Sequence, residues 1–331
     1  MHEWPDPAVV GRLFARLDAV GSAGAEGSTT TFTDLLEYES SLRTAPDVAD
    51  AIAVAALADA AADEVGADLL ATSQRLHRRL FERGSARQAA EAGRFKARTN
   101  LVVDPDSPLG LFAYTRPGSI GQAMLEWQDF VNTSSPDLPD LVRQCLGHWM
   151  FEHIHPFLGG NGRIGRLLIP ILLQRKGFTR STCAFVSEPI YHDKSLYVDG
   201  LKSARISGDM MAWTRLMLGF LHQTAMENIA RLDRLLEIRA RWRAATADAR
   251  ANSVIHRLVD YALTRPAFTI ADALDGIGGS FPAVNNAAGR LVDLNVLQVA
   301  RDTRRDRLFQ APEVLGVFDS FRTPSPGPTL A

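Results

Sequence analysis

The stretch His155-Pro-Phe-Leu-Gly-Gly-Asn-Gly-Arg-Ile-Gly-Arg166 carries the strongest fold signal in this chain of 331 residues. Three of the four residues from 159 to 162 are glycines, and they lie between two segments with helical periodicity. Glycine allows positive φ angles and a close approach of the backbone to a ligand. A helix that begins here presents unbonded N–H groups and the positive end of its dipole. The stretch therefore predicts an anion-binding turn suited to a di- or triphosphate.

Three charged or titratable residues flank this turn. Arg163 and Arg166 are three residues apart and share a helix face, so both guanidinium groups can reach one phosphate chain. His155 precedes Asn161 by six residues, which places it at the mouth of the turn. An imidazole there is suited to act as a general base or a proton shuttle.

Helical periodicity dominates the chain on both sides of the turn. A loop rich in Gly, Ser, Ala and Thr is expected at 21–31, and no strand-like alternation competes in the core, which is predicted to be all-α. Helices are expected at 7–20, 47–67, 68–83, 119–132, 138–154, 161–176, 194–207 and 209–243.

Composition indicates an ordinary globular protein, with 46% hydrophobic and 22% charged residues. The net charge of −2 provides no overall field toward nucleic acid or an anionic membrane. There is no signal-like start and no apolar run of membrane-spanning length, so a cytoplasmic location without membrane contact is predicted. The two cysteines, Cys145 and Cys183, are interpreted as core thiols.

The pattern changes near Thr246, where short helices, Gly-rich turns and an Arg-rich segment begin. A short helix started by Thr269 and a second helix capped by Ser280 predict a helix-turn-helix. Strands at 296–299 and 308–309 would form a wing. Candidate DNA contacts are Asn285, Asn286 and Arg290 for base edges and Arg301, Arg304, Arg305 and Arg307 for phosphates. Protein contact or homodimer formation through this region remains an equal alternative.

The turn resembles the signature HPFxDGNGRxxR of the Fic (filamentation induced by cAMP) family at every place but one. The whole chain resembles the subgroup with an N-terminal helical extension and a C-terminal winged helix. This implies a mainly α fold with a helical region at 1–92, a Fic core at 93–245 and a winged helix-turn-helix domain at 246–331. The supporting segments are Leu76-His-Arg-Arg-Leu80, Gly93-Arg-Phe-Lys96, Ala113-Tyr-Thr-Arg-Pro117 and Tyr197-Val-Asp-Gly-Leu201.

The resemblance implies a nucleotidyltransferase that moves AMP from ATP to a Ser, Thr or Tyr hydroxyl of another protein or of itself. His155 would deprotonate the hydroxyl, and Arg166 would hold the γ-phosphate. The α- and β-phosphates would be held by Gly160, Asn161, Gly162 and Arg163. The flap that aligns the target would comprise Tyr114, Thr115 and Arg116, and Tyr197 would line the nucleotide pocket.

Two departures from the family pattern bear on activity. Gly159 replaces the acidic residue that binds Mg²⁺, and glycine has no side-chain oxygen to offer a hard cation. The inhibitory glutamate of relatives has its nearest sequence match at 40–44, where Arg43 or Thr44 stands in its place; Glu37 fits a looser Ser/Thr-x-x-x-Glu pattern.

Because of the missing acid, two other hypotheses stay open beside AMP transfer. One is a nucleotide-binding sensor or DNA-binding regulator without catalysis. The other is a Fic enzyme that uses another phosphate donor or a small-molecule hydroxyl.

Overall fold

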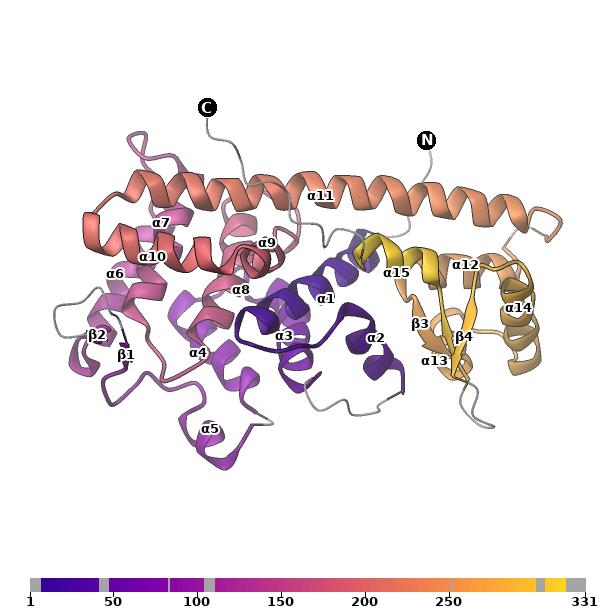
Figure 1. Cartoon of the computed structure of the whole chain (residues 1–331), viewed down its shortest axis with the longest axis horizontal. Helices are drawn as coiled ribbons and strands as arrows, with labels where there is room; N and C mark the ends of the chain where they lie inside the picture. Colours follow the sequence, from indigo (N-terminus) through magenta and orange to yellow (C-terminus); the bar gives the residue numbers. More distant parts are fainter. Residues whose placement is uncertain are drawn as a thin grey trace. The chain divides into compact units, whose positions relative to one another are not determined.

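The computed structural model describes residues 7–41, 48–82, 84–103, 111–250, 252–301 and 307–319. Helices dominate this part of the chain, which confirms the predicted mainly α class (Figure 1). The chain groups into two compact units, one formed by residues 21–27 and 52–224 and the other by 1–20, 28–51 and 225–331. Both boundaries of the expected three-part division, at 92/93 and 245/246, fall inside these units, and that division stays a prediction.

The unit that contains the turn is built from helices and one small hairpin. Its elements are α3 (Val48–Ala60), η1 (Ala61–Glu64), α4 (Leu69–Leu80), α5 (Ala86–Glu91), β1 (Leu101–Val103), β2 (Leu111–Ala113), η2 (Pro117–Ser119), α6 (Ile120–Asn132), α7 (Asp140–Ile154), α8 (Asn161–Arg175), α9 (Ser187–His192) and α10 (Lys194–Ser207). The last residues of α1 (Pro7–Ala25) and the first part of α11 (Met210–Ala245) also belong to it.

Helices α6 and α7 approach closely because the chain supplies a glycine at their contact. A Cβ atom at Gly147 would collide with the side chain of Val131. The buried Trp127 of α6 donates its indole N–H to the Gly147 carbonyl at 2.8 Å. This pair fixes α7, whose C-terminal end leads into the turn.

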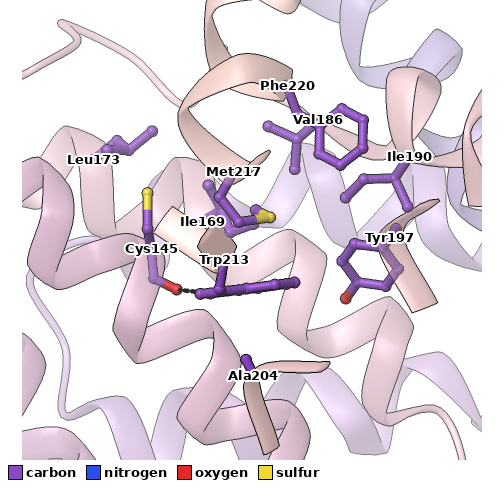
Figure 2. Close-up of a cluster of buried hydrophobic side chains, with 10 residues drawn as sticks. All are labelled: Cys145, Ile169, Leu173, Val186, Ile190, Tyr197, Ala204, Trp213, Met217 and Phe220. Carbon is purple, nitrogen blue, oxygen red and sulfur yellow. Dashed lines mark hydrogen bonds between the residues drawn. The ribbon is translucent and has the colours of Figure 1, made fainter. Parts of the chain in front are cut away.

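A buried apolar cluster includes residues of both α7 and α8 (Figure 2). Trp213 is 1% exposed and donates its indole N–H to the Cys145 carbonyl at 2.8 Å, so an otherwise apolar site contains no unsatisfied indole group. Ile169 and Leu173 of α8 pack into the same cluster. The position of α8 therefore depends on a close-packed core.

The expectation of an all-α core is wrong at one place. Strands β1 and β2 form an antiparallel hairpin in which Leu101 pairs with Ala113. Each strand has only three residues, too few to produce a readable alternation in the sequence.

The other unit contains α2 (Phe32–Ser41), α12 (Val254–Thr264), β3 (Ala267–Thr269), α13 (Ile270–Ile277), α14 (Phe281–Asp293), β4 (Gln298–Arg301), β5 (Leu308–Gln310) and α15 (Pro312–Asp319). The strands form an antiparallel sheet in the order β3-β5-β4. Thr269 caps α13 in a capping box with Asp272, and Ser280 caps α14. Both caps are where the sequence predicts them, and Ala267 and Phe268, which precede the first cap, belong to β3.

Helix α1 is longer than predicted, since it continues to Ala25 through the Gly- and Ala-rich segment that was expected to be a loop. Gly21 and Gly24 leave room there for close neighbours, because Cβ atoms at these positions would meet the Glu188 backbone and the Tyr191 ring. Among the described helices, none combines the length and the apolar character needed to cross a bilayer.

Candidate nucleotide-binding and active site

His155 ends helix α7 in a left-handed conformation, with φ 53° and ψ 61°. Pro156 follows directly and disfavours the right-handed helical region for the residue before it. A positive φ is uncommon for a residue other than glycine and is often found at functional sites. The local sequence thus turns the imidazole out of the helix at the point where the Gly-rich turn begins.

The hydrogen bonding of His155 selects its tautomer. Its Nδ1 lies 3.3 Å from the Glu152 carbonyl oxygen, and since a carbonyl can only accept, Nδ1 carries the proton. Burial, and secondarily the positive charge of Lys96, lower the pKa of His155 to about 4. The ring is therefore neutral at pH 7, with the Nε2 lone pair available to accept a proton.

The turn itself is held by backbone geometry and by two side chains. Gly160 is the N-cap of α8 with φ 76°, and a Cβ there would lie 2.9 Å from Leu80 and Phe81 atoms. Asn161 accepts from Phe157 N and donates to Phe157 O, both at 2.9 Å. The Asn161 side chain thus braces the turn from within.

The N–H groups of residues 161–163 precede the first hydrogen-bonded turn of α8, which begins with Ile164 N to Gly160 O at 3.1 Å. These three groups and the helix dipole form the positive end expected of an anion site. Arg163 lies at the same end, with its guanidinium carbon 5.3 Å from the centre of the Phe81 ring. The structure therefore places Gly160, Gly162 and Arg163 at the N-terminal end of α8, and their role in holding phosphates stays a prediction.

Arg166 is 4% exposed and is bound by the end of α1. It donates to Glu26 Oε1 at 2.9 Å, to Ser22 O at 3.0 Å and to Ser22 Oγ at 3.2 Å. A Cβ at Gly162 would lie 2.6 Å from Glu26 Oε1, so this carboxylate rests against the turn. Burial alone would raise the pKa of Glu26, but Arg166, Arg163 and Lys194 together lower it. Glu26 is thus a carboxylate anion held at the anion turn.

Sequence reasoning missed Glu26 and pointed to Glu37 instead. Glu37 accepts from Gln310 at 2.6 Å and lies 3.6 Å from Arg301, so it is engaged elsewhere. Arg43 and Thr44 lie outside the described residues. A signal was present, because Ser22-Ala-Gly-Ala-Glu26-Gly27 fits the looser pattern with the following glycine that Glu37 lacks. It was overlooked because this segment was expected to be a loop.

One of the three expected flap residues, Tyr114, lies against His155. Tyr114 follows β2 and stacks on His155, with ring centres 3.9 Å apart and an angle of 10° between the planes. Asn100 directly precedes β1 of the same hairpin and donates to the Leu158 carbonyl at 3.1 Å, which ties the hairpin to the turn. Thr115 is half-buried, and Arg116 is exposed and precedes η2.

Tyr197 lies in the buried apolar cluster (Figure 2). Its hydroxyl is 2.9 Å from His148 Nε2, and the side chain is 5% exposed. The structure thus surrounds Tyr197 with core side chains, below the turn. His153, two residues before His155, stacks on Trp149 with ring centres 4.9 Å apart.

Lys96 is a site residue that the sequence analysis did not single out. Its backbone N–H donates to the Pro156 carbonyl at 2.9 Å, and its Nζ lies 5.6 Å from the centre of the Tyr114 ring. The residue is 3% exposed, and Nζ has no hydrogen-bond partner within the described part of the chain. Burial lowers its pKa to about 8. The signal was its place in Gly93-Arg-Phe-Lys96, a segment that supports the resemblance.

The residues present do not fit the Mg²⁺ ion that the resemblance implies. Position 159 has no side-chain oxygen, and its carbonyl accepts from His77 Nε2 at 3.0 Å. His77 Nε2 must be the donor, because Nδ1 accepts from Gly93 N at 2.9 Å. No cluster of three or more His, Cys, Asp or Glu occurs among the described residues. Position 159 thus offers no carboxylate ligand of the kind that a hard cation requires.

Several candidate DNA contacts are already engaged with neighbours in their own unit. Arg290 pairs with Asp248 at 2.5 Å, and Arg307 donates to Asn285 Oδ1 at 2.5 Å. Arg301 lies 3.6 Å from Glu37. Asn286 is exposed on α14, and Arg304 and Arg305 lie outside the described residues.

Comparison with known proteins agrees with this geometry. A model of the Fic/DOC family matches residues 70–173, which contain the whole turn. The protein adenylyltransferase Fic of Drosophila willistoni is 36% identical over 89 residues, which are 27% of this chain and 16% of the relative. The chain therefore contains a Fic domain at residues 70–173. A second relative of that name, from Nematostella vectensis, is 29% identical over 119 residues, or 36% of this chain and 26% of the relative.

Solved Fic structures share the fold. A Fic family protein from Desulfovibrio desulfuricans G20 superposes with a TM-score of 0.57 at 18% identity, over 90% of this chain and 87% of that one. Fic-1 from C. elegans gives a TM-score of 0.51 at 21% identity, over 70% of this chain and 66% of that one. These solved structures share the fold of the chain. The segments that match the curated relatives span only about a sixth to a quarter of those relatives.

Proposed function

We propose that this chain is a Fic-type adenylyltransferase that moves AMP from ATP to a Ser, Thr or Tyr hydroxyl of a protein, and that Glu26 restrains it. The observation that carries the proposal is the neutral imidazole of His155, protonated on Nδ1, beside a helix N-terminus that carries Arg163. A proton acceptor next to an anion site is the arrangement needed for transfer from a polyphosphate.

In the proposed reaction the target hydroxyl oxygen attacks the α-phosphorus of ATP. The new bond joins that oxygen to AMP, the bond from the α-phosphorus to the oxygen bridging to the β-phosphate breaks, and pyrophosphate leaves. The hydroxyl proton passes to Nε2 of His155. The N–H groups at the start of α8 and Arg163 stabilise the charge on the phosphates.

Glu26 opposes this reaction by occupying the place of a phosphate. Its carboxylate bonds Arg166 and rests against Gly162, so the phosphates of a donor must compete with it. The same proposal assigns Tyr114, Thr115 and Arg116 to the alignment of the target segment, because Tyr114 covers His155. The substrate is another protein or a second copy of this chain.

The test is transfer of label from ATP labelled in its α-phosphate, with Glu26→Ala compared with the wild-type chain. Removing the competing carboxylate is expected to raise labelling of protein by about tenfold or more, since a charged hydrogen bond contributes about 1.5–3 kcal/mol. Glu126→Ala is the matched control, because this glutamate is exposed on α6 and contacts only Gln122 among the described side chains.

The label should disappear when His155→Ala is added to Glu26→Ala. Labelling that persists without His155 would contradict its role as the base. A Glu26→Ala chain that binds ATP but labels no protein would refute AMP transfer and favour a nucleotide sensor.

A further inference from the structure

A cavity of about 290 Å³ opens on the Gly159 side of the turn. It lies between the turn and the segment that contains α4 and α5, and His77 and Phe81 form part of its wall. The residues that matter for its chemistry are Arg87, Glu91, Arg98, Gly159, Gly160 and Arg163. The cavity therefore shares three residues with the anion turn.

The charge of this cavity favours an anion. Three arginines and one glutamate give 3 − 1 = +2. His77 adds no charge at pH 7, because burial lowers its pKa to about 4. Arg87 and Arg98 are both exposed, and neither forms an ion pair with a described residue. A net positive wall repels a divalent cation and attracts phosphate, which arginine binds through paired N–H donors.

The missing side chain at position 159 makes the cavity continuous with the turn. A Cβ at Gly159 would have no atom within 4 Å, so the place of the family's acidic residue is open space. An acidic side chain there would carry negative charge into the wall that holds Arg163. Glycine in place of the acidic residue therefore removes a metal ligand, and it leaves the arginines of the cavity wall accessible to an anion seated in the turn.

The size of the cavity limits what it can hold. At about 290 Å³ it lies at the lower end of the roughly 300–1,000 Å³ typical of ligand pockets. One or two phosphate groups fit such a space better than a whole nucleotide does. The opposite end of the turn is closed by Glu26 on Arg166, whereas this end is open.

We propose that this cavity is an anion subsite in which Arg87 and Arg98 hold a phosphate group of the ligand seated in the turn and supply positive charge in place of a metal ion. The proposal deepens the proposed function, since it concerns how the same site recognises its phosphate donor. Binding of the polyphosphate should then need no divalent cation.

The experiment is calorimetric titration of the full chain with ATP in EDTA and in Mg²⁺. All variants carry Glu26→Ala, so that its carboxylate does not occupy the turn. For the Glu26→Ala parent, the Kd for ATP in EDTA and the Kd in Mg²⁺ should agree within about threefold. Arg87→Ala with Arg98→Ala should raise the Kd in EDTA by about tenfold, as expected for two solvent-exposed phosphate contacts. Arg94→Ala is the matched control, because this arginine is exposed in the same segment but does not line the cavity.

Gly159→Asp provides the reverse test. A Cβ at this position meets no atom within 4 Å, and the added carboxylate should make ATP binding depend on Mg²⁺ by about tenfold. The proposal is overturned if EDTA abolishes ATP binding before any change at position 159, if the double arginine variant binds as its parent does in EDTA, or if ATP does not bind at all. Metal-free binding without label transfer would refute AMP transfer and leave the subsite standing.

Discussion

Two arginines of this molecule each pair with one carboxylate, yet their surroundings differ. Arg166 at the turn has a side chain that is 4% exposed, and its partner Glu26 is 36% exposed. Arg290 on α14 is 40% exposed, and its partner Asp248 is 70% exposed. The arginine at the turn is buried, whereas both members of the pair on α14 are open to solvent, so water and salt screen their interaction.

The difference teaches where an arginine can be used for binding. Arg166 is already removed from water and held by Ser22 and Glu26, so a phosphate that displaces Glu26 finds the cation oriented. The side chains of Arg290 and Arg307 are open to solvent and are engaged with Asp248 and Asn285, respectively. A nucleic acid would have to compete for both.

The largest effect is expected for Arg166→Met. This change removes three hydrogen bonds from a buried guanidinium and leaves the Glu26 carboxylate without its partner at the turn. The free energy of unfolding should fall by about 2–4 kcal/mol. Urea unfolding followed by tryptophan fluorescence measures it, since Trp127, Trp149 and Trp213 all belong to the unit that contains the turn.

If the free energy of unfolding falls by less than about 1 kcal/mol, the buried Arg166 pair contributes no more than an exposed ion pair does, and burial does not distinguish it from the Arg290 pair. Arg163→Met is the matched control, because it removes a second arginine one turn earlier on the same helix and keeps the hydrogen bonds from Arg166 to Ser22 and Glu26.

A smaller effect on the free energy of unfolding is expected when Glu152 is replaced. Glu152 lies close to Gly165 in α8, and its buried Oε1 has no hydrogen-bond partner in the described part of the chain. Burial raises the pKa of Glu152 to about 7. The folded chain therefore binds a proton that the unfolded chain releases near pH 4.5, so stability falls as the pH rises between these values.

Glu152→Gln should remove this fall, so its stability relative to wild type should improve from pH 4.5 to pH 7 by at most about 3 kcal/mol. Urea unfolding at pH 5 and pH 8 measures the change. Equal pH dependence in both chains would show that Glu152 is ionised in the folded state at pH 5.

The sequence predicts the turn well because its chemistry is local. Glycines at 159, 160 and 162 and the spacing of Arg163 and Arg166 are enough to specify a helix N-terminus with two cations. The caps Thr269 and Ser280 are also local signals, and both are confirmed.

Contacts between distant segments were not predictable in the same way. Glu26 and Arg166 are 140 residues apart, and nothing in the periodicity of α1 shows which helix its end will touch. Lys96 is likewise positioned through the Pro156 carbonyl, a tertiary contact. The hairpin β1–β2 is too short to compete with helical propensity in a local reading.

The smallest effect is expected for Arg290→Met, which tests the exposed half of the comparison. The hydrogen bond from Arg290 lowers the pKa of Asp248, so the contribution of the pair is present above the unfolded pKa of Asp248 and is lost as the pH falls through the folded value. Because both side chains are open to solvent, we expect the urea midpoint at pH 7 to stay within measurement error of wild type, and any difference to vanish at about 0.5 M salt. Asp248→Asn should behave alike. A clear loss of stability that persists in salt would show that burial does not separate the two arginine pairs, and that α14 depends on Arg290 as α8 depends on Arg166.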